Sequence, residues 1–308
     1  MKSLLAAACA IAIASPAFAG QIVSEPRDGK KAVINPCPPV NLFTFDIDSS
    51  YVFESDFKHS KNASGSAYSG DIDFGYRIPL GEGWPNVQCG TWNLRIGAHY
   101  SRHDFDHDGG LLPLPNHIQA LSGVVALEYI VDGQTGVIIE TRPGVFFEND
   151  ISKDNFDAPT FAAFAHRFTP GFVGVIGAAY GQFRKYPILP VVGFIWDIDE
   201  NWTLSAIYPK AQVLYKVSDT TKVYLGGEYV GDSVRVDDAK GRPARLDNAV
   251  LSYSEYRGTI GCQYTVGSLT ADLSAGWAFE RKFDYHRAGR DFKTDGAPFV
   301  ELALKAAF

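Results

Sequence analysis

The stretch His99–Gly110 ("HYSRHDFDHDGG") holds the densest group of side chains that could bind a metal ion or move a proton. Five of its residues carry the imidazole and carboxylate groups that divalent ions take as ligands: His103, Asp104, Asp106, His107 and Asp108. Their spacing is not that of an EF-hand loop, which needs Gly at its sixth and Glu at its twelfth position. The stretch therefore predicts an acidic, solvated loop and no cofactor, with a metal site as the alternative.

His99 and Ser101 lie two residues apart and could act as the base and the nucleophile of an acyl hydrolase. The chain has no Gly-x-Ser-x-Gly elbow to expose such a serine. In a strand, both residues would lie on the face opposite Trp92, Leu94 and Tyr100. We therefore expect no catalytic residues here, and keep a lipid-modifying enzyme as an alternative.

Charged residues recur on one face of most of the chain's alternating segments. They comprise ten acids and five bases: Asp46, Asp48, Asp71, Asp73, Glu128, Glu140, Glu228, Glu255, Asp272 and Glu301, with Arg77, Arg95, Arg142, Arg257 and Lys305. Because the acids outnumber the bases, a water-filled space lined by this face would favour cations. A carboxylate buried without a partner is costly, so some of these groups must pair with one another.

The elements that position these residues are predicted from hydrophobic period 2. Trp92, Leu94 and Ile96 alternate with polar residues, and Leu269 to Phe279 does the same, which indicates strands with two distinct faces. The pattern predicts fourteen strands: 42–56, 66–78, 90–104, 117–131, 135–148, 158–168, 172–183, 187–196, 202–208, 211–217, 221–236, 249–265, 268–283 and 297–308.

The predicted connections alternate between short turns, such as Val266–Ser268, and long polar loops, such as Asp104–Asn116. Alternating short and long connections are typical of a transmembrane antiparallel up-and-down β-barrel with short periplasmic turns and long outer loops. Fourteen strands are preferred. The hairpin at 202–217 is too short for the 9–11 residues of a membrane crossing, so twelve strands is the alternative.

In such a barrel the charged face points into the lumen and the aromatic face meets lipid. The charges then have two interpretations. They line an acid-rich channel for small hydrophilic solutes, or they pair with one another and pack a non-conducting barrel that is structural or binds surface partners. The sequence leaves both open, together with the solute and the oligomeric state.

The N-terminus predicts export. Residues 1–19 read as a signal peptide, with a basic start, an apolar run and the small-x-small site Ala17-Phe18-Ala19. Residues 20–40 contain four prolines and predict a periplasmic arm, and 41–308 form the barrel. No later stretch approaches the roughly 18–20 apolar residues of a transmembrane helix. The formal net charge of −7 gives no basic surface for nucleic acid.

Three cysteines follow the predicted signal peptide. Cys37 in the arm and Cys89 before the third strand could form a disulfide under oxidising conditions, or both could stay free. Cys262 falls on the predicted lipid face and is expected to be an inert apolar residue.

The segment Tyr186–Val230 carries several motifs: Pro187-Ile188-Leu189-Pro190, Gly193, Trp196, Asn201-Trp202-x-Leu204 and Pro209-x-Ala211. It resembles an uncharacterised family of Gram-negative outer-membrane β-barrels, catalogued only as a domain of unknown function. The resemblance implies a barrel in the cell outer membrane and no established activity. No functional residue is therefore carried over from it.

The chain ends on an alternating strand, with Phe308 as its last residue. Outer-membrane barrels present such an aromatic C-terminal strand to the assembly machinery, so by resemblance Phe308 is expected to be an assembly signal. The expected partners are thus outer-membrane lipid, lipopolysaccharide at the acidic loops, and the barrel-assembly machinery.

Overall fold

The computed structural model describes residues 41–58, 63–81, 90–107, 112–131, 134–238 and 243–308. The predicted signal peptide, the arm 20–40, Cys37, Cys89 and Asp108 lie outside the described residues. Within these ranges, no helix is both long and apolar enough to cross a membrane.

Fourteen strands form the wall of the molecule. They are β1 (Phe43–Asp56), β2 (Ser64–Pro79), β3 (Trp92–His107), β4 (His117–Ile130), β5 (Thr135–Thr141), β8 (Thr160–Thr169), β9 (Phe172–Tyr180), β10 (Ile188–Asp197), β11 (Trp202–Ile207), β12 (Lys210–Lys216), β13 (Thr221–Val230), β15 (Val250–Val266), β16 (Leu269–Tyr285) and β18 (Ala297–Ala307). The shorter elements of the described ranges are β6 (Gly144–Phe147), β7 (Phe156–Asp157), β14 (Ser233–Arg235), β17 (Arg290–Lys293) and the 3₁₀ turns η2 (Lys153–Asn155) and η3 (Ala244–Leu246).

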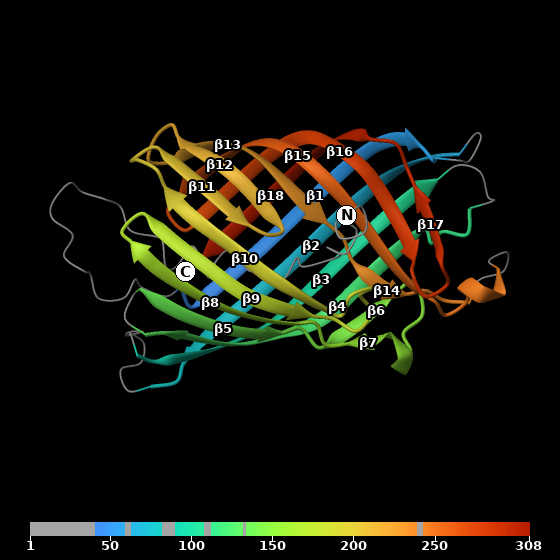
Figure 1. The fold of residues 1–308 in the computed structure, drawn as a ribbon, viewed down its shortest axis with the longest axis horizontal. Helices are drawn as coiled ribbons and strands as arrows, with labels where there is room; N and C mark the ends of the chain where they lie inside the picture. The colour runs from blue at the N-terminus through green and yellow to red at the C-terminus, as the bar shows by residue number, and fades with distance from the viewer. Residues whose placement is uncertain (1–40, 59–62, 82–89, 108–111, 132–133, 239–242) are drawn as a thin grey trace.

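The wall is a closed antiparallel barrel (Figure 1). Each wall strand pairs with its chain neighbours, and β1 also pairs with β18 from Thr44↔Ala307 to Val52↔Phe299. Phe43 and Phe308 exchange two backbone hydrogen bonds of 2.9 Å at this seam. The predicted fold class and the count of fourteen are confirmed. The alternative of twelve strands is wrong, because the hairpin at 202–217 forms two strands of the wall, β11 and β12.

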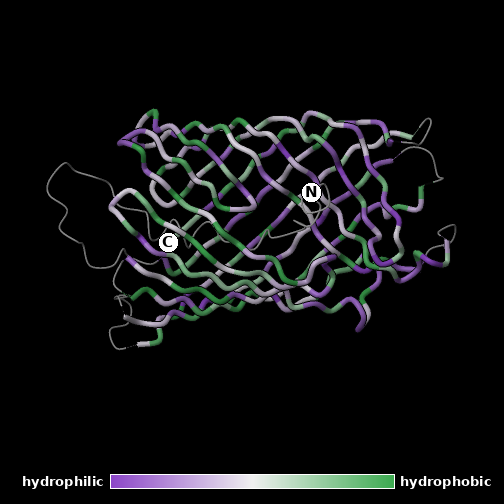
Figure 2. The backbone as a smooth tube through the Cα atoms, viewed as in Figure 1, coloured by the Kyte–Doolittle hydropathy of each residue, from purple (hydrophilic) through white to green (hydrophobic). Residues whose placement is uncertain are grey.

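Hydropathy alternates along the strands, as the colours of Figure 2 show, and burial assigns the two sets of residues to opposite faces. On β4, Leu121, Val125 and Leu127 are exposed, whereas Ser122 and Glu128 are buried. Many large apolar side chains are exposed over the whole wall, including Ile176, Leu225 and Ile260. A water-soluble protein rarely exposes so large an apolar surface, so this outside fits a lipid bilayer.

Two predicted strands are interrupted in the structure. The strand predicted at 135–148 breaks at Pro143, which lacks a backbone N–H, and continues as β6. A Cβ on Gly144 would lie 2.3 Å from the carbonyl of Leu121, so only glycine allows this approach. The strand predicted at 221–236 likewise breaks at Gly231 and continues as β14. Because the alternation of apolar and polar residues continues across both breaks, the sequence pattern did not predict either break.

The connections that hold β6, β7, β14 and β17 lie at one end of the barrel, called here the outer end (Figure 1). Inside this end lies a buried aromatic cluster, defined by Phe57, Phe105, Tyr253 and Phe283. The ring centroids of Phe105 lie 4.8 Å from Tyr253 and 4.9 Å from Phe283. These residues come from the outer ends of β3, β15 and β16 and from the residue after β1. Apolar side chains therefore fill the lumen where the long loops begin.

Candidate functional site inside the barrel

One ion-pair network crosses the inner faces of β2, β3, β4 and β5. Its six members are Arg77, Glu128, Arg95, Glu140, Arg142 and Asp73. Glu128 accepts from Arg77 at 2.8 Å and lies 3.2 Å from Arg95. Glu140 contacts Arg95 and accepts from Arg142 at 2.8 Å, and Arg142 lies 3.3 Å from Asp73. Each arginine thus has a carboxylate partner, which is what buried charges require.

A second network surrounds Arg257 of β15, whose side chain is almost fully buried. Its guanidinium contacts Glu255, lies 2.8 Å from Glu301 of β18, and lies 3.5 Å from Glu228 of β13. Lys210 of β12 extends the network by a 3.2 Å ion pair to Glu228. One arginine therefore holds together inward-pointing residues of β13, β15 and β18, and Lys210 adds β12 through Glu228.

Between the two networks runs a strip of carboxylates. The β1–β2 register places Asp46 opposite Asp73 and Asp48 opposite Asp71. Like charges directly opposite each other destabilise a sheet unless a cation or a proton compensates them. Lys305 of β18, the cross-strand partner of Asp46, supplies one positive charge. The strip is the part of the interior where acids are in excess.

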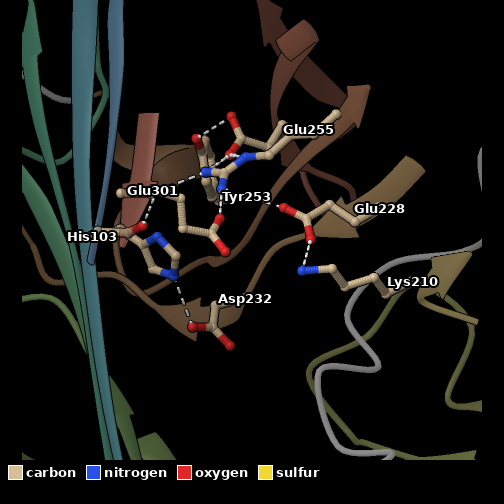
Figure 3. Close-up of polar contacts among 10 residues, drawn as sticks. His103, Lys210, Glu228, Asp232, Tyr253, Glu255 and Glu301 are labelled. Carbon is tan, nitrogen blue, oxygen red and sulfur yellow. Dashed lines mark hydrogen bonds and ion pairs between the residues drawn. The ribbon is translucent and has the colours of Figure 1, made fainter. Parts of the chain in front are cut away.

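Asp232, in the connection between β13 and β14, is a functional candidate that the sequence did not suggest. It accepts a hydrogen bond from the Ser101 hydroxyl at 3.1 Å and lies 3.1 Å from Nε2 of His103 (Figure 3). His99 lies instead near Asp73, with Nδ1 3.6 Å from Oδ2. The Ser101 hydroxyl therefore donates to a carboxylate, and His99 and Ser101 do not show the base and nucleophile arrangement of a hydrolase.

The structure does not gather the metal candidates of the sequence. His103 is buried and faces inward, whereas Asp104 binds Arg102 at 2.6 Å on the opposite face of β3. Successive strand residues point to opposite faces, so the described candidates between His103 and His107 are divided between the two faces. Within the described ranges no three His, Cys, Asp or Glu side chains form a possible metal cluster.

A cavity of about 70 Å³ lies beside these groups. Asp71, Asp232, Arg142 and Arg184 line it, together with Ser122 and Phe146. The Ser122 hydroxyl is buried and has no hydrogen-bond partner in the described part of the chain. A buried hydroxyl without a partner is costly, so a polar ligand or water in this cavity would be favoured.

Three further residues singled out from the sequence, Asp272, Lys305 and Cys262, lie outside the two networks. Asp272 accepts from the Tyr224 hydroxyl at 2.9 Å and from Gln263 at 3.0 Å. Lys305 is exposed. Cys262 is a free, exposed cysteine on the outer face. The sequence missed Arg281, which is buried and donates to the Ser55 hydroxyl at 2.7 Å. Because the networks hold both signs of charge, an acid-rich lumen stays a prediction.

Comparisons with known proteins return outer-membrane barrels as structural neighbours and assign the chain to no family. No family model and no curated protein matches the sequence. The family suggested by Tyr186–Val230 therefore stays a prediction. An outer membrane channel from Pseudomonas putida F1 aligns over 92% of this chain and 100% of its own, with 11% identity and a TM-score of 0.46. A mutant of the monoaromatic hydrocarbon channel TodX aligns over 88% of this chain and 91% of its own, with 9% identity and a TM-score of 0.41. The NanC porin aligns over 86% of this chain and 100% of its own, with 12% identity and a TM-score of 0.38. With TM-scores below 0.5, the function has to be inferred from the chain's own residues.

Proposed function

We propose that this protein is a barrel of the Gram-negative outer membrane and acts as a passive channel for small hydrophilic solutes. The observation that carries the proposal is the distribution of polarity across the wall. The closed wall is apolar on its outside, whereas arginine, lysine, aspartate and glutamate side chains face inward. Closed barrels satisfy every wall hydrogen bond without water, and a polar interior surrounded by such a wall suits an aqueous path.

The orientation follows from the connections. Both ends of the wall, at Phe43 and Phe308, lie at the end of the short turns, as in barrels that assemble from the periplasm. The long loops then face outside, where their acids would meet cation-bridged lipopolysaccharide. The C-terminal strand would meet the assembly machinery.

Conductance of the refolded protein in planar bilayers tests the channel. We expect steady, cation-preferring currents. Neutralising two acids of the strip by Asp46→Asn and Asp71→Asn, together with Glu301→Gln in the Arg257 network, should lower cation conductance by roughly tenfold at about 0.01 M salt, where screening is weakest. Asp219→Asn, in an exposed short turn, is the control and should leave conductance unchanged. Silence at every voltage from a folded barrel would exclude a channel.

One observation favours the alternative of a non-conducting barrel. The aromatic cluster fills the inside of the outer end, and an apolar constriction opposes ion passage because ions must lose hydration to cross it. On this alternative the networks serve to pack the interior and the long loops bind a surface partner. No catalytic residue is assigned on either proposal.

A further inference from the structure

The β11–β12 hairpin is shorter than the strands beside it. β11 has 6 residues and β12 has 7, whereas β10 and β13 have 10 each. At about 3.3 Å per residue and a tilt near 40°, six residues rise about 15 Å, against about 25 Å for the apolar belt of a membrane barrel. Figure 1 shows the hairpin confined to one end of the barrel while β10 runs on toward the other. Two of the fourteen strands therefore stop partway across the membrane.

Beyond the hairpin, one edge of β10 has no strand beside it. Among the described residues, 188–192 pair with β9 alone, because the β10–β11 register begins at Gly193↔Ile207. The carbonyl of Pro187 accepts from Gly181 on the β9 side. Backbone groups alternate sides along a strand, so those of Ile188 and Pro190 point away from β9. Proline has no N–H to leave unpaired, and it is the residue found at such edges.

The opposite rim of this gap is formed by the end of β13 and by β14. The turn of the hairpin closes the base, since Tyr229 N–H donates to the carbonyl of Pro209 at 3.0 Å. At the top, the Arg235 guanidinium lies 5.5 Å from the ring centroid of Phe183, in the β9–β10 connection. The gap is therefore bounded on both sides and at both ends by described residues. Its width at the base is at most about three strand spacings, roughly 14 Å.

The polar cavity shares residues with the rims of this gap. Arg184 comes from the β9–β10 connection at the top of the gap, and Gly231, Asp232 and Ser233 come from the β13–β14 rim. All four also line the cavity. Unpaired backbone at membrane depth is tolerated where it is buried in protein or lines a water-filled space.

We propose that the gap between β10 and β13–β14 is a lateral window. Through it, a single-chain amphiphile with a cationic head places that head in the cavity while its chain remains in the outer half of the membrane. The proposal rests on the membrane location proposed above but not on conduction.

The charges of the cavity select the head group. The lining holds the acids Asp71, Asp157 and Asp232 and the bases Arg142, Arg184 and His99. Arg142 is already paired with Glu140 and Asp73, and Asp157 accepts from the backbone N–H groups of Gln182 and Phe183. Asp71 faces another carboxylate, Asp48, across the strand pair. A cation beside Asp71 and Asp232 would relieve this repulsion, whereas an anion would add to it.

Photolabelling of the refolded, full-length barrel in vesicles tests the window. The probe is dodecyltrimethylammonium with a diazirine on the carbon next to the head, and the comparison probe is dodecyl sulfate with the same group. Adducts are mapped by mass spectrometry. We expect the cationic probe to label residues 184–192 and 229–235 about tenfold more than the anionic probe, as one charge-assisted contact would give.

Two variants decide the outcome. Extending the hairpin by two residues on each strand, beside Tyr208 and Pro209, should remove this labelling, whereas the same insertion in the short turn 218–220 should not. If the extended hairpin does not fold, Asp71→Asn with Asp232→Asn should lower the labelling in a heat-modifiable barrel. Equal labelling of the whole apolar belt, or labelling that survives these changes, would overturn the window. Selective labelling of a barrel that conducts no current would support the window and reject the channel.

Discussion

At the scale of single residues, Arg257 is the most connected charge of the interior. It joins β13, β15 and β18 through three carboxylates, and its guanidinium lies 4.7 Å from the ring centroid of Phe299. Removing one partner of a buried ion network leaves uncompensated charge, which costs far more than the network's net contribution.

Arg257→Met should therefore lower the free energy of unfolding by about 3–5 kcal/mol, because Glu228, Glu255 and Glu301 would then repel one another. Urea unfolding of the refolded barrel in detergent, followed by tryptophan fluorescence, measures the change. Arg102→Met removes a half-exposed ion pair with Asp104 and should cost less than about 1 kcal/mol. Equal losses for the two variants would contradict a central role for Arg257.

Residue positions in regular strands could be predicted from sequence, and those in irregular segments could not. Arg95 and Glu128 follow period 2, so their shared face was predictable, although their 3.2 Å contact depends on the β3–β4 register. Asp232 follows a break in its strand, where alternation no longer fixes direction. Its contact with His103, 129 residues earlier in the chain, follows only from the fold.

At the scale of elements, the C-terminal strand closes the wall and also carries the predicted assembly signal. The Phe308 side chain is exposed, and its backbone exchanges hydrogen bonds with Phe43. A substitution can therefore remove the ring and keep the bonds that close the wall.

If Phe308 is the predicted assembly signal, Phe308→Ala should lower the amount of barrel in the outer membrane and leave refolding in detergent unchanged, because refolding in detergent needs no assembly machinery. Heat-modifiable mobility of the protein in outer-membrane fractions measures insertion. Phe43→Ala, an exposed aromatic at the same seam, is the matched control and should insert normally. Similar losses in both variants would indicate a general role for aromatics at this seam.

The alternation pattern predicted all fourteen wall strands, including the short hairpin that left twelve as an alternative. It did not predict β7 or β17, nor that β6 and β14 are separate strands. These strands have 2–4 residues, and so short a run carries no recognisable period. They occur at the outer end, where loops fold against one another and tertiary contacts override local pattern.

At the scale of the whole molecule, the aromatic cluster and the ion networks divide the interior. The networks lie on the short-turn side of the aromatic cluster, while Phe57, Phe105, Tyr253 and Phe283 fill the outer end. The sequence predicted the charged face but not this cluster, because its members lie at strand ends contributed by distant parts of the chain.

Phe105→Ala with Phe283→Ala should widen the outer end and raise single-channel conductance several-fold, at a cost to stability of about 3–5 kcal/mol for each ring removed. Planar-bilayer recording gives the conductance and urea unfolding gives the stability. Phe279→Ala, an exposed ring on the outer face of β16, should change neither greatly. Unchanged conductance in a folded double variant would show that the cluster does not limit passage.

The seam between β1 and β18 also sets an order in time. β1 can pair with β2 as soon as that neighbour is present, but its other edge pairs with Ala297–Ala307, more than 200 residues further along the chain. Until that strand pairs, an open edge and an apolar belt are exposed together, the combination that drives chains to aggregate. A wall whose first strand is closed by so distant a partner therefore cannot bury its open edge until every strand between them is present.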